Sequence, residues 1–126
     1  MTDPAAILAS IGDTPILELR RVVPAGSARV VVKLESMNPT GSMKDRMARA
    51  VIEGAIADGK LARGGTVVEY TGGSTGTSLA FICAALGFPI TVVSSDAFSQ
   101  EKRDHMRALG ATVLESRVTA AARRRS

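Results

Sequence analysis

The segment Asn38–Arg46 (NPTGSMKDR) holds a lysine where it could serve carbonyl chemistry. Its proline and glycine predict a tight loop, and Ser42 then begins a predicted helix, which places Lys44 in the first helical turn. A cation there opposes the positive end of the helix dipole, so the local field favours the neutral amine. A neutral lysine amine can form a Schiff base with a carbonyl cofactor. The alternative is a lysine that pairs with Asp45 or is exposed to water.

The segment Thr71–Gly76 (TGGSTG) is a second candidate, because it lies between a predicted strand and a predicted helix. Consecutive glycines let the backbone approach a ligand, and free N–H groups at a helix start bind anions such as phosphate or carboxylate. The segment lacks the lysine of a P-loop and the G-x-G-x-x-G spacing of dinucleotide-binding loops. The alternative is a tight turn without a ligand.

The other reactive residue types give little support for other chemistry. Cys83 lies among apolar residues of a predicted helix, so we expect a core thiol rather than a nucleophile. His105 falls on a charged helix face and is expected to be solvated. A single cysteine and a single histidine exclude a multi-cysteine zinc site, and we expect no metal.

Alternating strands and helices would position these candidates. Apolar, β-branched runs predict buried strands, and segments rich in alanine or leucine that end at glycine predict helices. Ser42 and Asp45 have the spacing of a capping box. The alternation predicts an α/β fold of three layers, with a parallel, twisted sheet flanked by helices and covered on both faces. The predicted strands are Arg29–Leu34, Thr66–Glu69, Pro89–Val93 and Ala111–Leu114, and the predicted helices are Ser42–Asp58, Thr77–Leu86 and Ser99–Leu109.

Length, charge and hydrophobicity argue against a membrane protein and a nucleic-acid-binding protein. The 126 residues, 45% of them hydrophobic, fit one globular domain. Four arginines in residues 117–126 account for the net charge of +4, because the rest holds 12 basic and 12 acidic residues. We expect residues 115–126 to be a disordered basic tail; a nucleic-acid-binding arm is the alternative, but few aromatic residues are present for stacking. With no apolar run near about 20 residues and no basic leader, we expect a cytoplasmic protein without membrane or nucleic-acid partners.

Three segments together resemble a known family. Ile11–Ile16 (IGDTPI), Leu34–Arg46 (LESMNPTGSMKDR) and Glu69–Gly76 (EYTGGSTG) are similar, in order and spacing, to the cysteine synthase/cystathionine β-synthase family. These are fold-type II pyridoxal-phosphate enzymes of the tryptophan synthase β superfamily. The resemblance runs from about Ile11 to Val113. It implies that residues 1–114 form the N-terminal part of the family's α/β fold, which is incomplete here, and that residues 115–126 do not match it.

The resemblance also implies roles for the two candidate segments. Lys44 matches the catalytic lysine that holds the cofactor, pyridoxal 5'-phosphate, and moves the substrate's α-proton. Ser74 stands where the family usually has an asparagine that also contacts the cofactor, and Tyr70 stands where proline is common. The residues that match the loop binding the amino-acid carboxylate are Thr71, Gly72, Gly73, Ser74 and Thr75.

The implied reaction is β-elimination from serine or O-acetylserine, followed by addition of sulfide or a thiol, as in cysteine biosynthesis by a homodimer. The family's second half, which supplies the loop for the cofactor phosphate, has no match in this sequence, so the alternative is a truncated, non-catalytic remnant. A nicotinamide-binding module is disfavoured by the glycine spacing. Lys44 and Ser74 both begin helices that follow predicted parallel strands. We therefore expect them to lie close together beyond the carboxyl ends of the strands.

Overall fold

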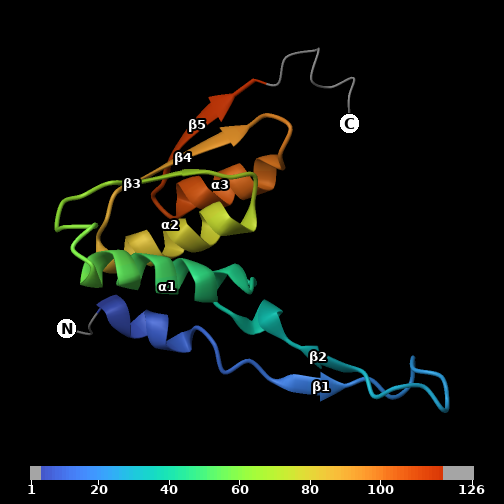
Figure 1. Cartoon of the computed structure of the whole chain (residues 1–126). Coiled ribbons are helices and arrows are strands. Elements are labelled where there is room, and N and C mark those ends of the chain that lie inside the picture. Colours follow the sequence, from blue (N-terminus) through green and yellow to red (C-terminus); the bar gives the residue numbers. More distant parts are fainter. Residues whose placement is uncertain (1–3, 118–126) are drawn as a thin grey trace.

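The structure is a computed structural model that describes residues 4–117, with side chains from residue 6 onward. Its α/β architecture confirms the fold class expected from the sequence (Figure 1). The elements in chain order are η1 (Pro4–Ser10), β1 (Ile16–Glu18), β2 (Val31–Lys33), η2 (Glu35–Met37), α1 (Lys44–Ala57), β3 (Val67–Tyr70), α2 (Ser74–Leu86), β4 (Ile90–Ser95), α3 (Gln100–Ala108) and β5 (Thr112–Ser116).

The main sheet is parallel, with β4 between β3 and β5. Helices α2 and α3 connect the strands in order and lie on the same face of the sheet, and α1 packs against α2 on the side away from the sheet (Figure 1). Right-handed crossovers between strands that follow one another in the same direction place both helices on one face. The core fills the space between that face and the helices, and Ile82, Val92 and Met106 within it are fully buried.

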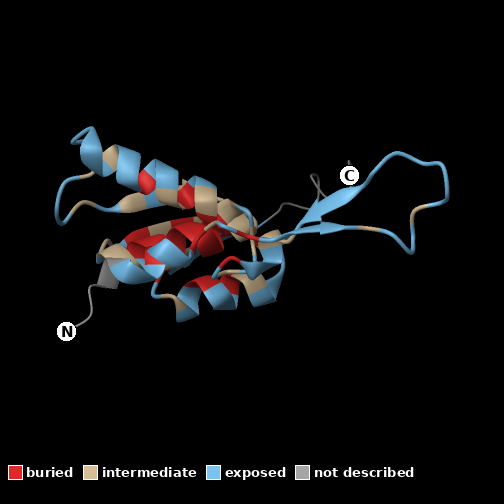
Figure 2. Cartoon of the chain, turned by 90° about the horizontal axis from the view of Figure 1, so that it is seen from below, coloured by how far each residue is buried: buried red, intermediate tan, exposed pale blue. Residues whose placement is uncertain are grey.

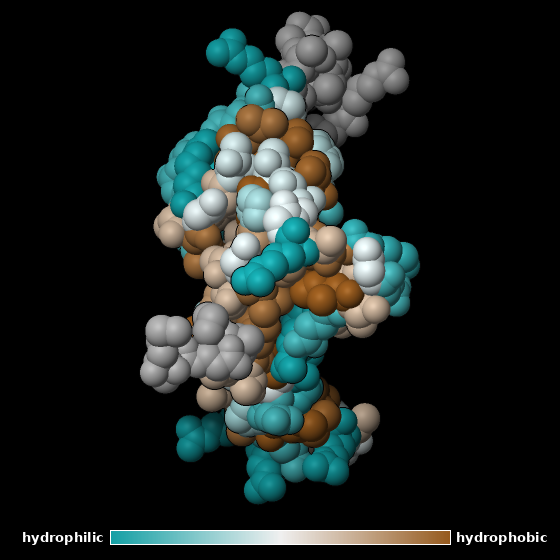
Figure 3. Space-filling view, turned by 90° about the vertical axis from the view of Figure 1, so that its left-hand side faces the viewer, coloured by the Kyte–Doolittle hydropathy of each residue, from teal (hydrophilic) through white to brown (hydrophobic). Residues whose placement is uncertain are grey.

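The opposite face of the sheet is open in the described part of the chain. Val68 is 67% exposed, Tyr70 65% and Leu114 53%, although all three side chains come from strands. The expectation that helices cover both faces was therefore wrong for residues 4–117. Figure 3 shows the side of the molecule that lies on the left in Figure 1. Hydrophobic surface is exposed on that side too, between hydrophilic side chains.

A small antiparallel ribbon of β1 and β2 extends away from this body (Figure 2). All three residues of each strand are exposed, so the prediction of a buried strand over Arg29–Leu34 was wrong in burial and overlong. A β-branched run favours extended backbone, but only the tertiary structure decides what packs against it. The ribbon also means that α1 does not follow a strand of the parallel sheet.

The helix predictions hold with shifted ends. Helix α1 ends beside Gly59, whose φ of +70° and N–H bond to the Ile56 carbonyl (3.0 Å) match the predicted glycine stop. Helix α2 begins at Ser74 rather than Thr77, so half of the predicted Thr71–Gly76 loop is its first turn. Helix α3 differs from the prediction by one residue at each end.

Strand β5 runs past the predicted end at Leu114. Glu115 and Ser116 pair with Ser94 and Ser95 of β4, so the predicted strand was two residues short. The predicted tail was therefore wrong for Glu115 and Ser116; Arg117 is exposed after the strand, and residues 118–126 lie outside the described residues. Within the described ranges, no helix is long and apolar enough to cross a membrane.

Candidate functional site

The loop that leads into α1 is fixed by a buried asparagine. The Asn38 side-chain amide donates to the Glu35 carbonyl and to Glu35 Oε2, both at 2.9 Å, and its oxygen accepts the Gly12 N–H at 3.0 Å. Gly41 closes the turn with an N–H bond of 2.8 Å to the Asn38 carbonyl, at a φ of +73°. The proline- and glycine-containing segment is therefore a rigid approach to the helix, as its turn residues indicate.

Asp45 does not form the predicted capping box. Its carboxylate is fully buried and accepts the Thr40 N–H at 2.8 Å, the Thr40 hydroxyl at 2.5 Å and the Ser78 hydroxyl at 2.5 Å. Ser42 Oγ does accept the Lys44 N–H at 3.1 Å. The capping-box expectation was wrong because the Asp45 carboxylate bonds Thr40 and Ser78 and not the Ser42 N–H. The Ser78 bond joins the start of α1 to the second turn of α2.

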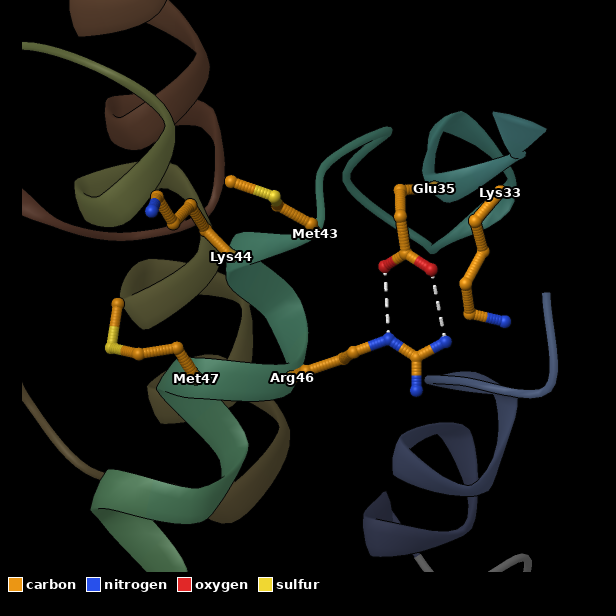
Figure 4. Close-up of a pocket in the computed structure, with 6 residues that line it drawn as sticks. All are labelled: Lys33, Glu35, Met43, Lys44, Arg46 and Met47. Atoms are coloured by element: carbon orange, nitrogen blue, oxygen red, sulfur yellow. Dashed lines mark hydrogen bonds and ion pairs between the residues drawn. The ribbon is translucent and has the colours of Figure 1, made fainter. Parts of the chain in front are cut away.

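Arg46 is held by a bidentate ion pair on another side of the helix. Its Nε and Nη2 donate to the two Glu35 carboxylate oxygens at 2.9 and 3.0 Å (Figure 4). Nη2 also donates to Thr14 Oγ1 at 3.0 Å. The hydrogen bonds from Arg46 and then Thr14 lower the pKa of Glu35 from its usual 4.5 to about 2. The same pair raises the pKa of Arg46. Both groups thus stay charged and bound to each other at neutral pH.

Lys44 is the amine that these neighbours leave free. Its Nζ makes no hydrogen bond or ion pair with any residue in the described part of the chain, so pairing with Asp45 is not the arrangement observed. The half-buried side chain extends from the start of α1 on the side away from the Glu35–Arg46 pair (Figure 4). It borders an open hollow of about 500 Å³, whose lining residues are Lys33, Glu35, Met43, Lys44, Arg46 and Met47.

The Thr71–Gly76 segment presents unpaired backbone donors. Helix α2 has no side-chain cap, and its first hydrogen bond to the preceding turn runs from the Thr77 N–H to the Gly73 carbonyl at 3.2 Å. The N–H groups of Ser74, Thr75 and Gly76 have no acceptor among residues 4–117. Three such donors at the positive end of a helix favour a bound anion.

The three glycines of this segment have different surroundings. A Cβ at Gly72 would lie 2.3 Å from the Phe98 ring, and a Cβ at Gly76 would lie 2.5 Å from the Met106 sulfur. A Cβ at Gly73 would meet nothing within 4 Å. Packing therefore requires glycine at two positions, while the space over Gly73 is open to a ligand.

The starts of α1 and α2 come together in the fold. Asp45, next to Lys44, bonds Ser78, which lies one turn after Ser74. Figure 1 shows both helix starts on the side of the molecule where the carboxyl ends of the parallel strands lie. From the sequence, Lys44 is expected at this edge because its helix would follow a strand of the parallel sheet. That reason was wrong, because the strand before α1 belongs to the antiparallel ribbon. Packing of α1 on α2 determines its place instead.

Sequence reasoning missed some residues near this site. Arg103 lies on the same predicted helix as His105, where a charged side chain is expected to be solvated, yet it is 6% exposed and bonds the carbonyls of Ser95, at the end of β4, and Phe98. The turn residues Asp96–Ser99 after a strand were the available signal. Two other expectations are confirmed: Cys83 is fully buried, which raises its pKa to about 11, and His105 is exposed. No cluster of three potential metal ligands occurs among the described residues.

The fold and this site together define an α/β unit in which a lysine without a partner among the described residues lies on a helix packed against a second helix, whose first N–H groups have no acceptor there. The family model described as pyridoxal-phosphate dependent enzyme matches residues 7–125, so the chain belongs to this family of pyridoxal-phosphate-dependent enzymes. The structural and sequence relatives agree with the resemblance to cysteine synthases.

The relatives are considerably longer than this chain. Cysteine synthase of Staphylococcus aureus is 48% identical over 104 residues, which are 82% of this chain and 34% of that protein. O-ureido-L-serine synthase of Streptomyces lavendulae is 44% identical over 109 residues, 86% of this chain and 33% of that protein. The chain thus spans about a third of the length of the curated relatives it matches.

Two solved structures illustrate the likeness of fold. A crystal structure of O-ureido-L-serine synthase has a TM-score of 0.84 and 43% identity, and the match covers 88% of this chain and 35% of that one. An O-acetyl serine sulfhydrylase isoform from Entamoeba histolytica has a TM-score of 0.81 and 37% identity, with 88% of this chain and 34% of that one covered.

Proposed function

We propose that this chain supplies the lysine and the substrate-carboxylate loop of a cysteine-synthase-like site. The observation that carries the proposal is the unpaired Lys44 amine at the start of α1, which the Asp45–Ser78 bond joins to α2 and its uncapped N–H groups. The amino-acid substrate would be serine or O-acetylserine, and the second substrate sulfide or a thiol. The relatives named for cysteine and O-ureido-L-serine synthesis support an activated serine as the shared substrate class.

The described residues fit the aldehyde end of pyridoxal phosphate. Lys44 Nζ is free to bond it, and the hollow beside the lysine, with Met43 and Met47 in its wall, is open to a planar ring. When bound, the cofactor supplies an electron sink for the electrons left after removal of the α-proton. The Lys44 amine would be the base that takes that proton and holds it at Nζ.

The Thr71–Gly76 segment would orient the substrate. Its carboxylate would accept the N–H groups of Ser74, Thr75 and Gly76, and the open space over Gly73 leaves room for it. Thr71 and Gly72 hold the strand end of this loop, and Thr71 N–H is bonded to the Val93 carbonyl at 3.0 Å. The Ser74 hydroxyl would donate to the cofactor or the substrate in place of the family's longer amide.

The extent of the domain and the assembly are parts of the same proposal. Residues 1–114, continued by Glu115 and Ser116 of β5, would form the N-terminal part of the family fold, and the residues after them a basic tail. A homodimer and a cytoplasmic location would follow from the family. The second candidate function is a remnant that binds ligands without turnover.

Trapping of the lysine tests the proposal directly. The purified chain is incubated with pyridoxal phosphate, reduced with borohydride and digested, and the modified lysine is located by mass spectrometry. We expect modification of Lys44 in the wild type and its loss in Lys44→Ala. Lys60→Ala is the matched control, because Lys60 is an exposed lysine paired with Asp58 far along the chain.

Turnover separates the two candidate functions. O-acetylserine and sulfide are added to the loaded chain, and cysteine is measured. Lys44-dependent cysteine formation supports the enzyme, whereas specific trapping at Lys44 without cysteine supports the remnant. Modification spread evenly over Lys33, Lys44 and Lys60 would contradict the site itself.

A further inference from the structure

The loop after β4 holds a buried guanidinium that the proposed chemistry does not use. Arg103 of α3 is 6% exposed, and its Nη1 donates to the Ser95 carbonyl at 3.0 Å and to the Phe98 carbonyl at 2.6 Å. Its Nη2 donates to Gln100 Oε1 at 2.5 Å, and its Nε lies 3.5 Å from Glu115 Oε1. Burial of a charged group is unfavourable unless it is paired and hydrogen-bonded, so these contacts fix both the arginine and the loop.

The loop in turn contacts the proposed carboxylate site through one side chain. The Phe98 ring occupies the space beside Gly72, where an added Cβ would meet three ring carbons at 2.3–2.5 Å. Within the described residues, Gly73 has hydrogen bonds from its N–H to Thr71 Oγ1 at 3.4 Å and from the Thr77 N–H to its carbonyl at 3.2 Å, whereas the Gly72 backbone has none. The position of Phe98 therefore determines how far Gly72 can move away from the start of α2.

We propose that Arg103 is a positioning residue for the carboxylate site: it fixes the Phe98 backbone, and the Phe98 ring fixes Gly72 and the N–H groups that follow it. This inference rests on the proposed function, because that function assigns the anion to these N–H groups. Arg103 touches no substrate in this arrangement. It acts through the Phe98 ring, whose contact with Gly72 keeps the N–H groups of Ser74, Thr75 and Gly76 directed at one point.

The test compares two arginines that share one acidic partner. Arg107 also pairs with Glu115, at 2.5 Å, but its bonds go to exposed side chains and to no carbonyl of the loop. Arg103→Gln and Phe98→Ala are prepared with Arg107→Gln as the matched control. Amide NMR spectra follow Gly72–Gly76 during titration with O-acetyl-L-serine, and backbone relaxation and hydrogen exchange of Gly72 and Gly73 are measured without ligand.

We expect Arg103→Gln and Phe98→Ala to weaken the affinity for O-acetyl-L-serine, measured from the shift titration, by about tenfold. Arg107→Gln should leave this affinity unchanged. In the free chain, the same two variants should increase the mobility and exchange of Gly72 and Gly73, and Arg107→Gln should not. Phe98→Leu, which restores an apolar contact beside Gly72, should recover part of the affinity. Trapping at Lys44 should persist in all variants.

The outcomes separate this inference from the proposed function. If the wild type shows no shifts at Ser74–Gly76, the carboxylate assignment fails, and the mobility of Gly72 and Gly73 then decides the positioning role alone. Equal affinity in all variants, or glycine mobility that does not change in Arg103→Gln and Phe98→Ala, would overturn the inference. An equal loss of affinity in Arg107→Gln would overturn it too, because the effect would then follow global stability.

Discussion

Replacement of Asp45 by alanine should destabilise the chain strongly, although the residue makes no direct contact with a ligand in the proposed site. Its buried carboxylate accepts three hydrogen bonds, two from Thr40 and one from Ser78. Hydrogen bonds to a charged group contribute about 1.5–3 kcal/mol each, and the loss of one partner of a buried charged network costs about 3–5 kcal/mol. We expect Asp45→Ala to lower the free energy of unfolding by about 3–5 kcal/mol, since three donors lose their acceptor.

Urea unfolding measures this effect, with a double-mutant cycle to assign it. Ser78→Ala removes a single bond to the carboxylate and should cost about 1.5–3 kcal/mol. In the double variant the costs should not add, and we expect a coupling energy of about 1–2 kcal/mol between Asp45 and Ser78. Asp58→Ala is the control, because this exposed carboxylate pairs only with Lys60 and should change stability by less than about 0.5 kcal/mol.

Two results would refute this reasoning. A loss below about 1 kcal/mol in Asp45→Ala would show that the buried network contributes no more than a surface contact. Strict additivity in the Asp45/Ser78 cycle would show that the bond between α1 and α2 is not what positions the start of α1. In that case the packing of apolar side chains alone would have to place Lys44.

Three further predictions concern pH and packing. Arg46 and Thr14 lower the pKa of Glu35 to about 2, so the unfolded chain binds more protons than the folded chain below about pH 4.5. The free energy of unfolding should therefore fall as the pH drops from about 4.5 toward 2. Glu35→Gln should lack this contribution in acid unfolding experiments. Gly76→Ala should cost about 1–3 kcal/mol in urea unfolding, because its Cβ would lie 2.5 Å from the Met106 sulfur; a neutral effect would mean that this helix start can move. Burial raises the pKa of Cys83 from 9.0 to about 11, so the unfolded chain ionises first and about 2–3 kcal/mol of stability should be lost between pH 9 and 11, a decline that Cys83→Ala should abolish.

Several features could be predicted from the sequence because they depend only on a residue and its neighbours along the chain. The glycine after α1 needs a positive φ, and the strand–helix alternation permits few arrangements other than a parallel sheet. Glycine pairs before a helix leave N–H groups free, and that property needs no tertiary contact. The burial of Cys83 followed from its apolar neighbours along one helix.

Tertiary contacts decided the rest, because they join residues that no spacing rule connects. Asp45 has the separation of a capping residue, but Thr40 and a serine 33 positions away compete successfully for its carboxylate. The β-branched run that became β2 is extended as expected, but its exposure depends on what lies beside it.

The candidate site likewise has features that the sequence predicts and features that only the tertiary structure determines. The identity of Lys44 and of the Thr71–Gly76 donors could be read from the sequence, since helix starts and glycine loops have local signatures. The expectation that the two helix starts lie together was made from the sequence, but its reason was wrong for α1, which packs on α2 and does not follow a strand of the parallel sheet. The burial of Arg103 was equally hidden: a charged residue on an amphipathic helix is normally solvated, and the tertiary contacts with the Ser95 and Phe98 carbonyls help to make its burial favourable.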